Sequence, residues 1–333
     1  MRNNRAAGAR RCGVAMAAVL ALATLQVPVG SARAGHNPDL IPQAPGAESQ
    51  VLRMRLFEAA QKGETENVVR FLAEGAPVEG RDRFGNTALL VAARAGRTKA
   101  VGVLLEAGSE IDHQNLRGTT ALLHAATASK NRTVKALVAA GAAVNLENRK
   151  GVTPLIAAAF DGDARIFAVL IEAGADPKAV DRTGKSAMFY TAGRGFAGIV
   201  ETLHGLGVDV NQVLGNDLTA LMWAAGYSSD VPASDGLATV VLLLELGAEV
   251  GARDNRGRTA LMIAAERDHA EVVDALVKAG AMPGIQDKKG KTALDLARAA
   301  GSLNAITALG AAGGATGGAT GGATGSATGS ATQ

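Results

Sequence analysis

The 333-residue sequence lacks several features on which catalytic, metal-binding and disulfide-bonded proteins depend. It has a single cysteine, Cys12, and only 3% of its residues are aromatic. His-Glu-x-x-His, Gly-x-Ser-x-Gly and phosphate-binding glycine patterns do not occur in it. The five histidines are scattered at spacings that metal sites do not use. We therefore expect no enzyme activity, and no catalytic, cofactor-binding or metal-binding residues.

Long hydrophobic runs are also lacking outside the N-terminus. Residues 1–34 contain an apolar run over residues 13–29 and end on Ala32-Arg33-Ala34, and before the run stand Arg2, Arg5, Arg10 and Arg11. These are the three parts of a secretory signal peptide, and the run is shorter than the roughly 20 residues of a membrane span. We expect cleavage before Gly35 and a periplasmic protein with no membrane span. Secretion from the cell and an uncleaved N-terminal anchor are the alternatives.

Charge of one sign does not dominate the chain once that segment is set aside. The full sequence has 34 Lys and Arg against 31 Asp and Glu, and residues 1–34 hold five of the basic residues and no acidic one. The remaining chain therefore has 29 basic and 31 acidic residues. The sequence pI of about 9.1 reflects the N-terminal segment, so nucleic acid is not an expected partner.

What the sequence does contain is a repeat. Blocks 86–118, 119–151 and 152–184 are each 33 residues long and carry the same residue types in the same positions. The second residue of each block is a threonine that can cap a helix, and in the third block Pro154 follows at the first helical position. A glycine follows each second apolar run, where a residue with positive φ ends a helix: Gly75, Gly108, Gly141, Gly174, Gly207, Gly247 and Gly280.

Each block therefore predicts a pair of helices. Ala-Ala pairs such as Ala158 and Ala159 keep one side of the first helix thin, so that the next pair can approach closely. A single pair cannot bury its own apolar side, and the repeats must share a continuous core.

Thr153-Pro-Leu-Ile-Ala-Ala-Ala, followed by Leu-Ile-Glu-Ala-Gly-Ala-Asp-Pro, resembles the ankyrin repeat. The resemblance implies an all-α solenoid of about eight helix-turn-helix units with β-turn or hairpin fingers over residues 51–313. One departure is consistent, since the histidine that usually follows Thr-Pro-Leu is replaced by Leu90, Leu123, Ile156, Phe189, Met222, Met262 and Asp295. The fingers are therefore expected to rely more on packing.

The flanking segments differ in composition. Residues 35–50 are proline-rich and aperiodic, which predicts a linker, and residues 314–333 repeat Gly-Ala-Thr-Gly and Ser-Ala-Thr-Gly tetrads, which predict a disordered tail. The sixth repeat (residues 218–257) is longer than the others, with seven extra residues within 226–236. Such insertions lie on exposed edges, either as part of a binding surface or as tolerated surface loops.

The resemblance also implies where a partner binds, namely the concave side formed by finger tips and first helices. Six of the seven tips carry basic residues, and the tip candidates are Arg83, Phe84, Arg117, Arg149, Lys150, Arg182, Lys185, Arg256, Arg258, Lys288 and Lys289. A row of cations predicts a protein partner with an acidic surface.

Aromatic residues add to this face. Phe160 and Tyr227 are predicted to be exposed anchors after the Ala-Ala pairs, whereas Tyr190 and Trp223 fall in a column expected to be core. The expected function is a monomeric, non-catalytic protein-interaction module of the periplasm. The alternative is a secreted effector or inhibitor that acts on a host or competitor protein.

Overall fold

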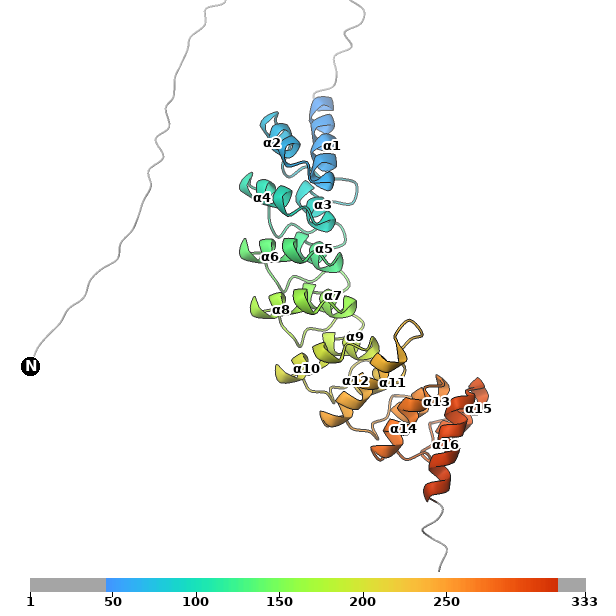
Figure 1. Ribbon diagram of the computed structural model, residues 1–333. Helices are drawn as coiled ribbons and strands as arrows, with labels where there is room; N and C mark the ends of the chain where they lie inside the picture. The colour runs from blue at the N-terminus through green and yellow to red at the C-terminus, as the bar shows by residue number, and fades with distance from the viewer. Residues whose placement is uncertain (1–45, 317–333) are drawn as a thin grey trace, which may run out of the picture. The chain divides into compact units, whose positions relative to one another are not determined.

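The computed structural model describes residues 46–316, which form helices stacked in consecutive pairs (Figure 1). Within these residues, α1, α3, α5, α7, α9 and α11 form one layer, and α2, α4, α6, α8 and α10 form the other. The helices are α1 Ala47–Lys62, α2 Thr65–Ala73, α3 Ala88–Ala95, α4 Thr98–Glu106, α5 Ala121–Thr127, α6 Asn131–Ala139, α7 Pro154–Asp161, α8 Ala164–Glu172, α9 Ala187–Gly193, α10 Ala197–Gly205, α11 Ala220–Ala225, α12 Ala233–Glu245, α13 Ala260–Glu266, α14 Ala270–Lys278, α15 Ala293–Ala300 and α16 Leu303–Thr316. The predicted all-α fold of eight helix pairs is confirmed.

Helix starts and stops follow the predicted signals. The Thr153 hydroxyl accepts the Ile156 N–H, and equivalent caps form at Thr120, Thr219, Thr259 and Thr292. All seven glycines predicted to follow a second helix have positive φ, from 78° at Gly207 to 93° at Gly75 and Gly280. A residue with a Cβ is strained in this conformation, so glycine ends the helices there without cost.

The core runs continuously between neighbouring pairs. Ala92, Ala125, Ala158, Ala224 and Ala264 are fully buried where successive first helices meet. Most of the helices have only six to nine residues, shorter than a helix that is stable alone in water. Their stability therefore comes from the interfaces between neighbouring repeats.

The turns that precede α3, α5, α7, α9, α11, α13 and α15 are here called the fingers. In most of them an Asp or Asn closes the turn, as where Asn148 Oδ1 accepts the N–H groups of Lys150 and Val152. The same position holds Asp82, Asn115, Asp181, Asp254 and Asp287. Successive fingers are joined by backbone hydrogen bonds, such as Arg149 N to Arg117 O (2.9 Å) and Arg182 N to Lys150 O (2.9 Å).

The finger before α11 departs from this pattern. Leu214 stands where the other fingers have Asp or Asn, and it has no side-chain acceptor for the turn. Asn216 and Asp217 both adopt positive φ, at 69° and 59°. The hydrogen bond that would join this finger to the one before it, from Gly215 N to Thr183 O, is missing from the described part of the chain.

The insertion in the sixth repeat is partly buried. Some of it lengthens α12, which has 13 residues, and the rest forms a loop whose Tyr227 and Val231 are buried. The loop also reaches the preceding repeat, where Arg194 lies 3.9 Å from the Asp230 carboxylate. The insertion is therefore part of the packed stack.

The ends of the array lie slightly outside the predicted boundaries. Helix α1 begins at Ala47, four residues before the expected start at Val51, and Glu48 in its first turn favours that end of a helix. Helix α16 continues to Thr316. The predicted signal peptide, residues 35–45 of the predicted linker and residues 317–333 of the predicted tail lie outside the described residues. Among those described, no helix has the length and apolar character of a membrane span.

Candidate protein-binding face

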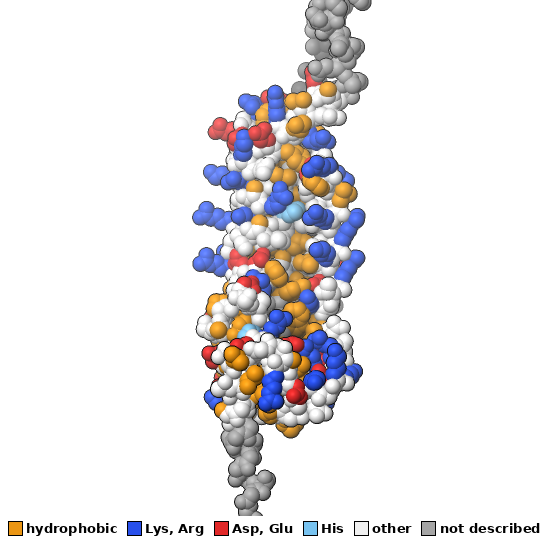
Figure 2. Space-filling view, turned by 90° about the vertical axis from the view of Figure 1, so that its right-hand side faces the viewer, with side chains coloured by type: hydrophobic (Ala, Val, Ile, Leu, Met, Phe, Trp, Pro, Cys, Tyr) orange, Lys and Arg blue, Asp and Glu red, His pale blue; other side chains and the backbone are white. Residues whose placement is uncertain are grey.

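The side of the stack formed by the first helices carries an apolar stripe between two basic flanks. Figure 2 shows hydrophobic side chains along the middle of this face and Lys and Arg side chains gathered on both sides of them. The fingers and the exposed sides of the first helices contribute to it. Each predicted site residue can be placed in relation to this face.

Most of the predicted tip residues are exposed. They are Arg83, Phe84, Arg117, Arg149, Lys150, Arg182, Arg256, Lys288 and Lys289. The Arg83 guanidinium lies 4.7 Å from the ring centroid of Phe84, which is 49% exposed. Within residues 46–316, no ion pair engages Arg117, Arg149 or Arg182, so their charges face solvent along consecutive fingers. This part of the predicted basic row is present.

Two predicted tip residues of the finger before α13 form ion pairs. Arg258 is buried and forms an ion pair with Glu266, so its prediction as an exposed tip is wrong. It follows the finger glycine and turns toward the helix that comes after. Arg256 is exposed, but its guanidinium lies 3.3 Å from the carboxylate of Asp254 in the same finger, which partly neutralises it.

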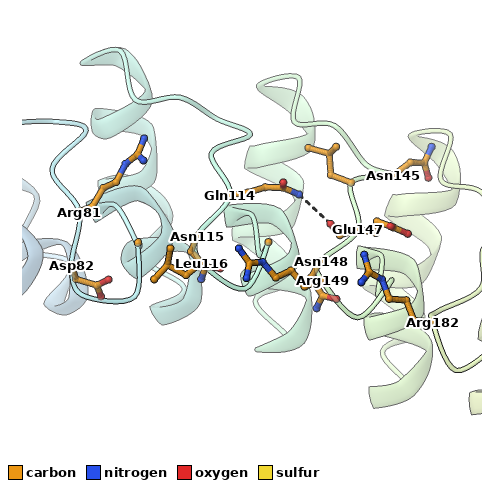
Figure 3. A pocket seen from close by; sticks show the side chains of 13 residues that line it. Arg81, Asp82, Gln114, Asn115, Leu116, Asn145, Glu147, Asn148, Arg149 and Arg182 are labelled. Atoms are coloured by element: carbon orange, nitrogen blue, oxygen red, sulfur yellow. Dashed lines mark hydrogen bonds between the residues drawn. The ribbon is translucent and has the colours of Figure 1, made fainter.

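The fingers before α3, α5 and α7, with Arg182 of the finger before α9, border a groove of about 820 Å³. Arg81, Arg149 and Arg182 line it, and Figure 3 shows these side chains along the row of fingers. Gln114 Nε2 donates to the Glu147 carbonyl oxygen at 3.0 Å and ties two of the fingers together. The groove is held by hydrogen bonds between repeats, which fix the spacing of its cations.

Aromatic side chains gather beside the fingers in the fourth to sixth repeats. Phe160, predicted as an anchor, is 44% exposed, and its ring meets that of Tyr190 edge to face at 5.4 Å. The Arg194 guanidinium lies 4.6 Å from the Phe160 ring centroid. An exposed ring held by an aromatic neighbour and a cation loses little side-chain freedom on binding, which favours a contact residue.

Tyr190 and Trp223 continue this cluster. We expected both in the core, but each is only partly buried, because the preceding column (Phe189 and Met222) fills the core. Lys185, predicted as a tip residue, is partly buried between them, with its Nζ 4.7 Å from the Trp223 ring centroid and 5.7 Å from that of Tyr190. The placement of Lys185 between two aromatic rings was not predicted from the sequence.

A hydrogen bond joins the aromatic cluster to the finger before α9. The Tyr190 hydroxyl donates to Asp181 Oδ2 at 2.6 Å. Burial and this bond raise the pKa of Tyr190 to about 12. Burial alone would raise the pKa of Asp181, but hydrogen bonds from Tyr190, Thr183 and the backbone outweigh it and lower the pKa below its usual value. Tyr190 therefore keeps its proton and Asp181 its charge at neutral pH.

Tyr227 is the second wrong site prediction. It is only 7% exposed and packs within the sixth repeat. Counting from the Ala-Ala pair, Gly226 rather than Tyr227 occupies the position of Phe160, and the insertion folds the next residue inward. Tyr227 thus belongs to the core.

These features define a helical-repeat protein in which exposed cations and partly exposed aromatic rings extend across several repeats. The family described as "Ankyrin repeats (3 copies)" matches residues 39–115, 107–181, 155–232 and 231–316. The chain belongs to the ankyrin-repeat family, whose members are typically non-catalytic modules that bind other proteins. A comparison with curated proteins gives no match.

Proposed function

We propose that this chain is an exported, non-catalytic module of the periplasm that binds an acidic segment of a partner protein across its fingers and first helices. The observation that carries this proposal is the placement of solvent-facing cations beside partly exposed aromatic rings. Arg149 and Arg182 lie on the fingers, and Asp181, next to Arg182, is bonded to the aromatic cluster through Tyr190.

The two kinds of residue serve different steps of binding. Unpaired cations on adjacent fingers attract an acidic segment over several ångströms and raise the association rate. Aromatic rings such as Phe160 give up solvent contact only in the complex and slow its dissociation. A partner segment with carboxylates on both sides of an apolar residue fits this combination.

The test begins with affinity capture of the partner from periplasmic extract, followed by binding kinetics with purified protein. Reversing Arg149, Lys150 and Arg182 to Glu is expected to slow association about tenfold or more at moderate salt. The matched control reverses Lys99, Arg132 and Arg165, which are exposed on α4, α6 and α8, and so makes the same charge change on the second helices. Equal losses in both triple variants would mean general charge attraction and would contradict a site on the fingers.

The aromatic part has its own test. Phe160→Ala is expected to raise the dissociation rate while leaving association and folding nearly unchanged, because the ring is half exposed. Unchanged kinetics for both Phe160→Ala and the finger variant would place the partner on another surface.

Export is tested separately by fractionating cells and sequencing the N-terminus of the protein. We expect a periplasmic chain that begins at Gly35, because Ala32 and Ala34 are the small residues that signal peptidase requires. An intact N-terminus in the cytoplasm would contradict the location without affecting the binding face.

A further inference from the structure

Three potential metal ligands from two neighbouring repeats meet in the loops that precede α3 and α5. Glu79 lies in the loop between α2 and α3, and Glu110 and His113 lie in the loop between α4 and α5. One ligand atom from each lies within 4.8 Å of the others. We propose that Glu79, Glu110 and His113 bind a divalent transition-metal ion of which zinc is the representative.

The orientation of His113 favours a ligand role. Its side chain is only 6% exposed, and Nε2 lies 2.8 Å from the carbonyl oxygen of Gly85. Because a carbonyl oxygen can only accept, Nε2 carries the hydrogen, and the neutral ring has its lone pair on Nδ1. A hydrogen bond from the far nitrogen to a backbone carbonyl is also what orients metal-bound histidines in proteins.

The Nδ1 atom faces a carboxylate at a separation that a hydrogen bond does not explain. Glu110 Oε2 lies 3.7 Å away, longer than a hydrogen bond between nitrogen and oxygen. Two atoms bound to the same zinc ion at about 2.0–2.2 Å each are separated by roughly 3–4 Å. The gap between His113 and Glu110 therefore matches two ligands of one cation.

Glu79 supplies an oxygen without another partner. Its Oε1 accepts the Glu110 N–H at 2.9 Å, while Oε2 is shielded from solvent and lacks a hydrogen-bond partner among the described residues. The hydrogen bond to Glu79 Oε1 is a general feature of the repeat. It recurs in the following loops, where Asp112 and Asn145 accept the equivalent backbone N–H groups. Among the described residues, the second side-chain atoms of Asp112 and Asn145 are not left buried without a partner as Oε2 is, and a cation would compensate for burying the Glu79 charge.

The repeat does not require a histidine at position 113. No other repeat has an ionisable side chain there, and the equivalent residues are Gly80, Leu146, Ala179, Gln212, Ala252 and Ile285. This departure occurs where the two glutamates approach. The site is not evident from the sequence, because Glu79 lies more than thirty positions from Glu110 and His113; the only sign of it is a histidine at a position that is uncharged in the other repeats.

The ligand set points to the class of ion. Magnesium and calcium prefer oxygen ligands alone, whereas one imidazole with carboxylates suits zinc, cobalt and related ions. Glu110 is exposed, with 65% of its side chain accessible, so water can complete the coordination. Bound there, the ion would join the loops of two adjacent repeats.

Titration of the metal-free full chain with Co²⁺, whose visible absorption reports its ligands, and with Zn²⁺ by calorimetry tests the proposal. We expect one equivalent to bind, and the melting temperature to rise with Zn²⁺. Glu110→Gln, which changes an exposed side chain, is expected to weaken binding tenfold or more. His113→Leu, which introduces the residue found at position 146, is expected to abolish it.

His124 provides the matched control, because it lies on α5, close to His113 in the sequence, but outside this group. His124→Ala is expected to bind one equivalent like the parent. Absence of binding by the parent would overturn the proposal and leave a polar contact between His113 and Glu110. Equal binding by the parent, Glu110→Gln and His113→Leu would also overturn it, since the ion would then be held elsewhere.

Discussion

The Tyr227 ring stacks on the imidazole of His269, with centroids 3.8 Å apart and planes only 4° from parallel. Tyr227 follows α11 and His269 precedes α14, so the contact joins the insertion of the sixth repeat to the seventh. His269 is fixed in turn, because its Nδ1 lies 3.0 Å from the carbonyl oxygen of Ala225. The insertion is therefore held against the stack from both neighbouring repeats.

Replacing Tyr227 by Ala should cost about 3 kcal/mol of unfolding free energy, because a buried aromatic ring is removed from a packed site. Urea denaturation provides the measurement. Tyr227→Phe, which keeps the stacked ring, should lose much less, and Phe160→Ala should be close to the parent. A loss for Phe160→Ala as large as that for Tyr227→Ala would show that exposure does not separate their roles.

Ala158→Leu should destabilise the array by about 1–3 kcal/mol, because Ala158 is fully buried in α7 and larger side chains overpack such a contact. Ala168→Leu in α8 makes the same chemical change at an exposed position and should have little effect. Thermal unfolding of both variants checks the expectation. Similar losses for the two would argue against a tight interface between first helices.

Asp217→Gly should stabilise the finger before α11 by roughly 0.5–1 kcal/mol. Asp217 has φ of 59° at a position where the other fingers have glycine, and glycine adopts that conformation without strain.

The reverse exchange, Gly184→Asp, should destabilise by a similar amount. A Cβ at Gly184 meets only ordinary contacts, so φ alone accounts for the cost. Chemical denaturation of both variants measures the pair, and changes of the same sign would contradict the explanation.

His124 should make the fold sensitive to mild acid. Burial, with Arg94 and Arg117 nearby, lowers the pKa of His124 to about 4 from the ordinary value of 6.5, and Asn115 Nδ2 donates toward its Nε2 at 3.4 Å. As the pH falls, the His124 imidazole is therefore protonated in the unfolded chain at a higher pH than in the folded chain. The stability present above pH 6.5 is therefore lost as the pH falls toward 4, by roughly 3 kcal/mol.

Unfolding free energies of the parent and of His124→Ala, measured between pH 7 and pH 4, test this expectation. Alanine occupies the equivalent position in the next repeat, at Ala157. The variant should lose less stability over this range. Parallel pH curves would show that His124 does not titrate in the manner described.

The repeat period made the fold predictable, because the capping threonines and the glycines after the second helices act locally. The site was only partly predictable. Arg149 and Arg182 lie at turn tips, where position in the repeat decides exposure. Arg258 and Tyr227 depend on contacts outside that register, one with Glu266 and the other with His269 across an insertion. Periodicity predicts what the repeats share, whereas each of these two contacts occurs only once among the described residues.

The missing hydrogen bond between the fingers before α9 and α11 has a consequence for cooperativity. In an array whose stability is a sum of nearest-neighbour terms, a weakened junction divides the folding transition. Here the fifth and sixth repeats lose a bond on the finger edge but gain the contact between Arg194 and Asp230 near the insertion. The finger edge of this junction thus lacks a backbone bond that the other finger junctions have, although Lys185 still lies against Trp223 there. Opening there changes the angle between the first five repeats and the last three, and with it the curvature that a bound partner meets.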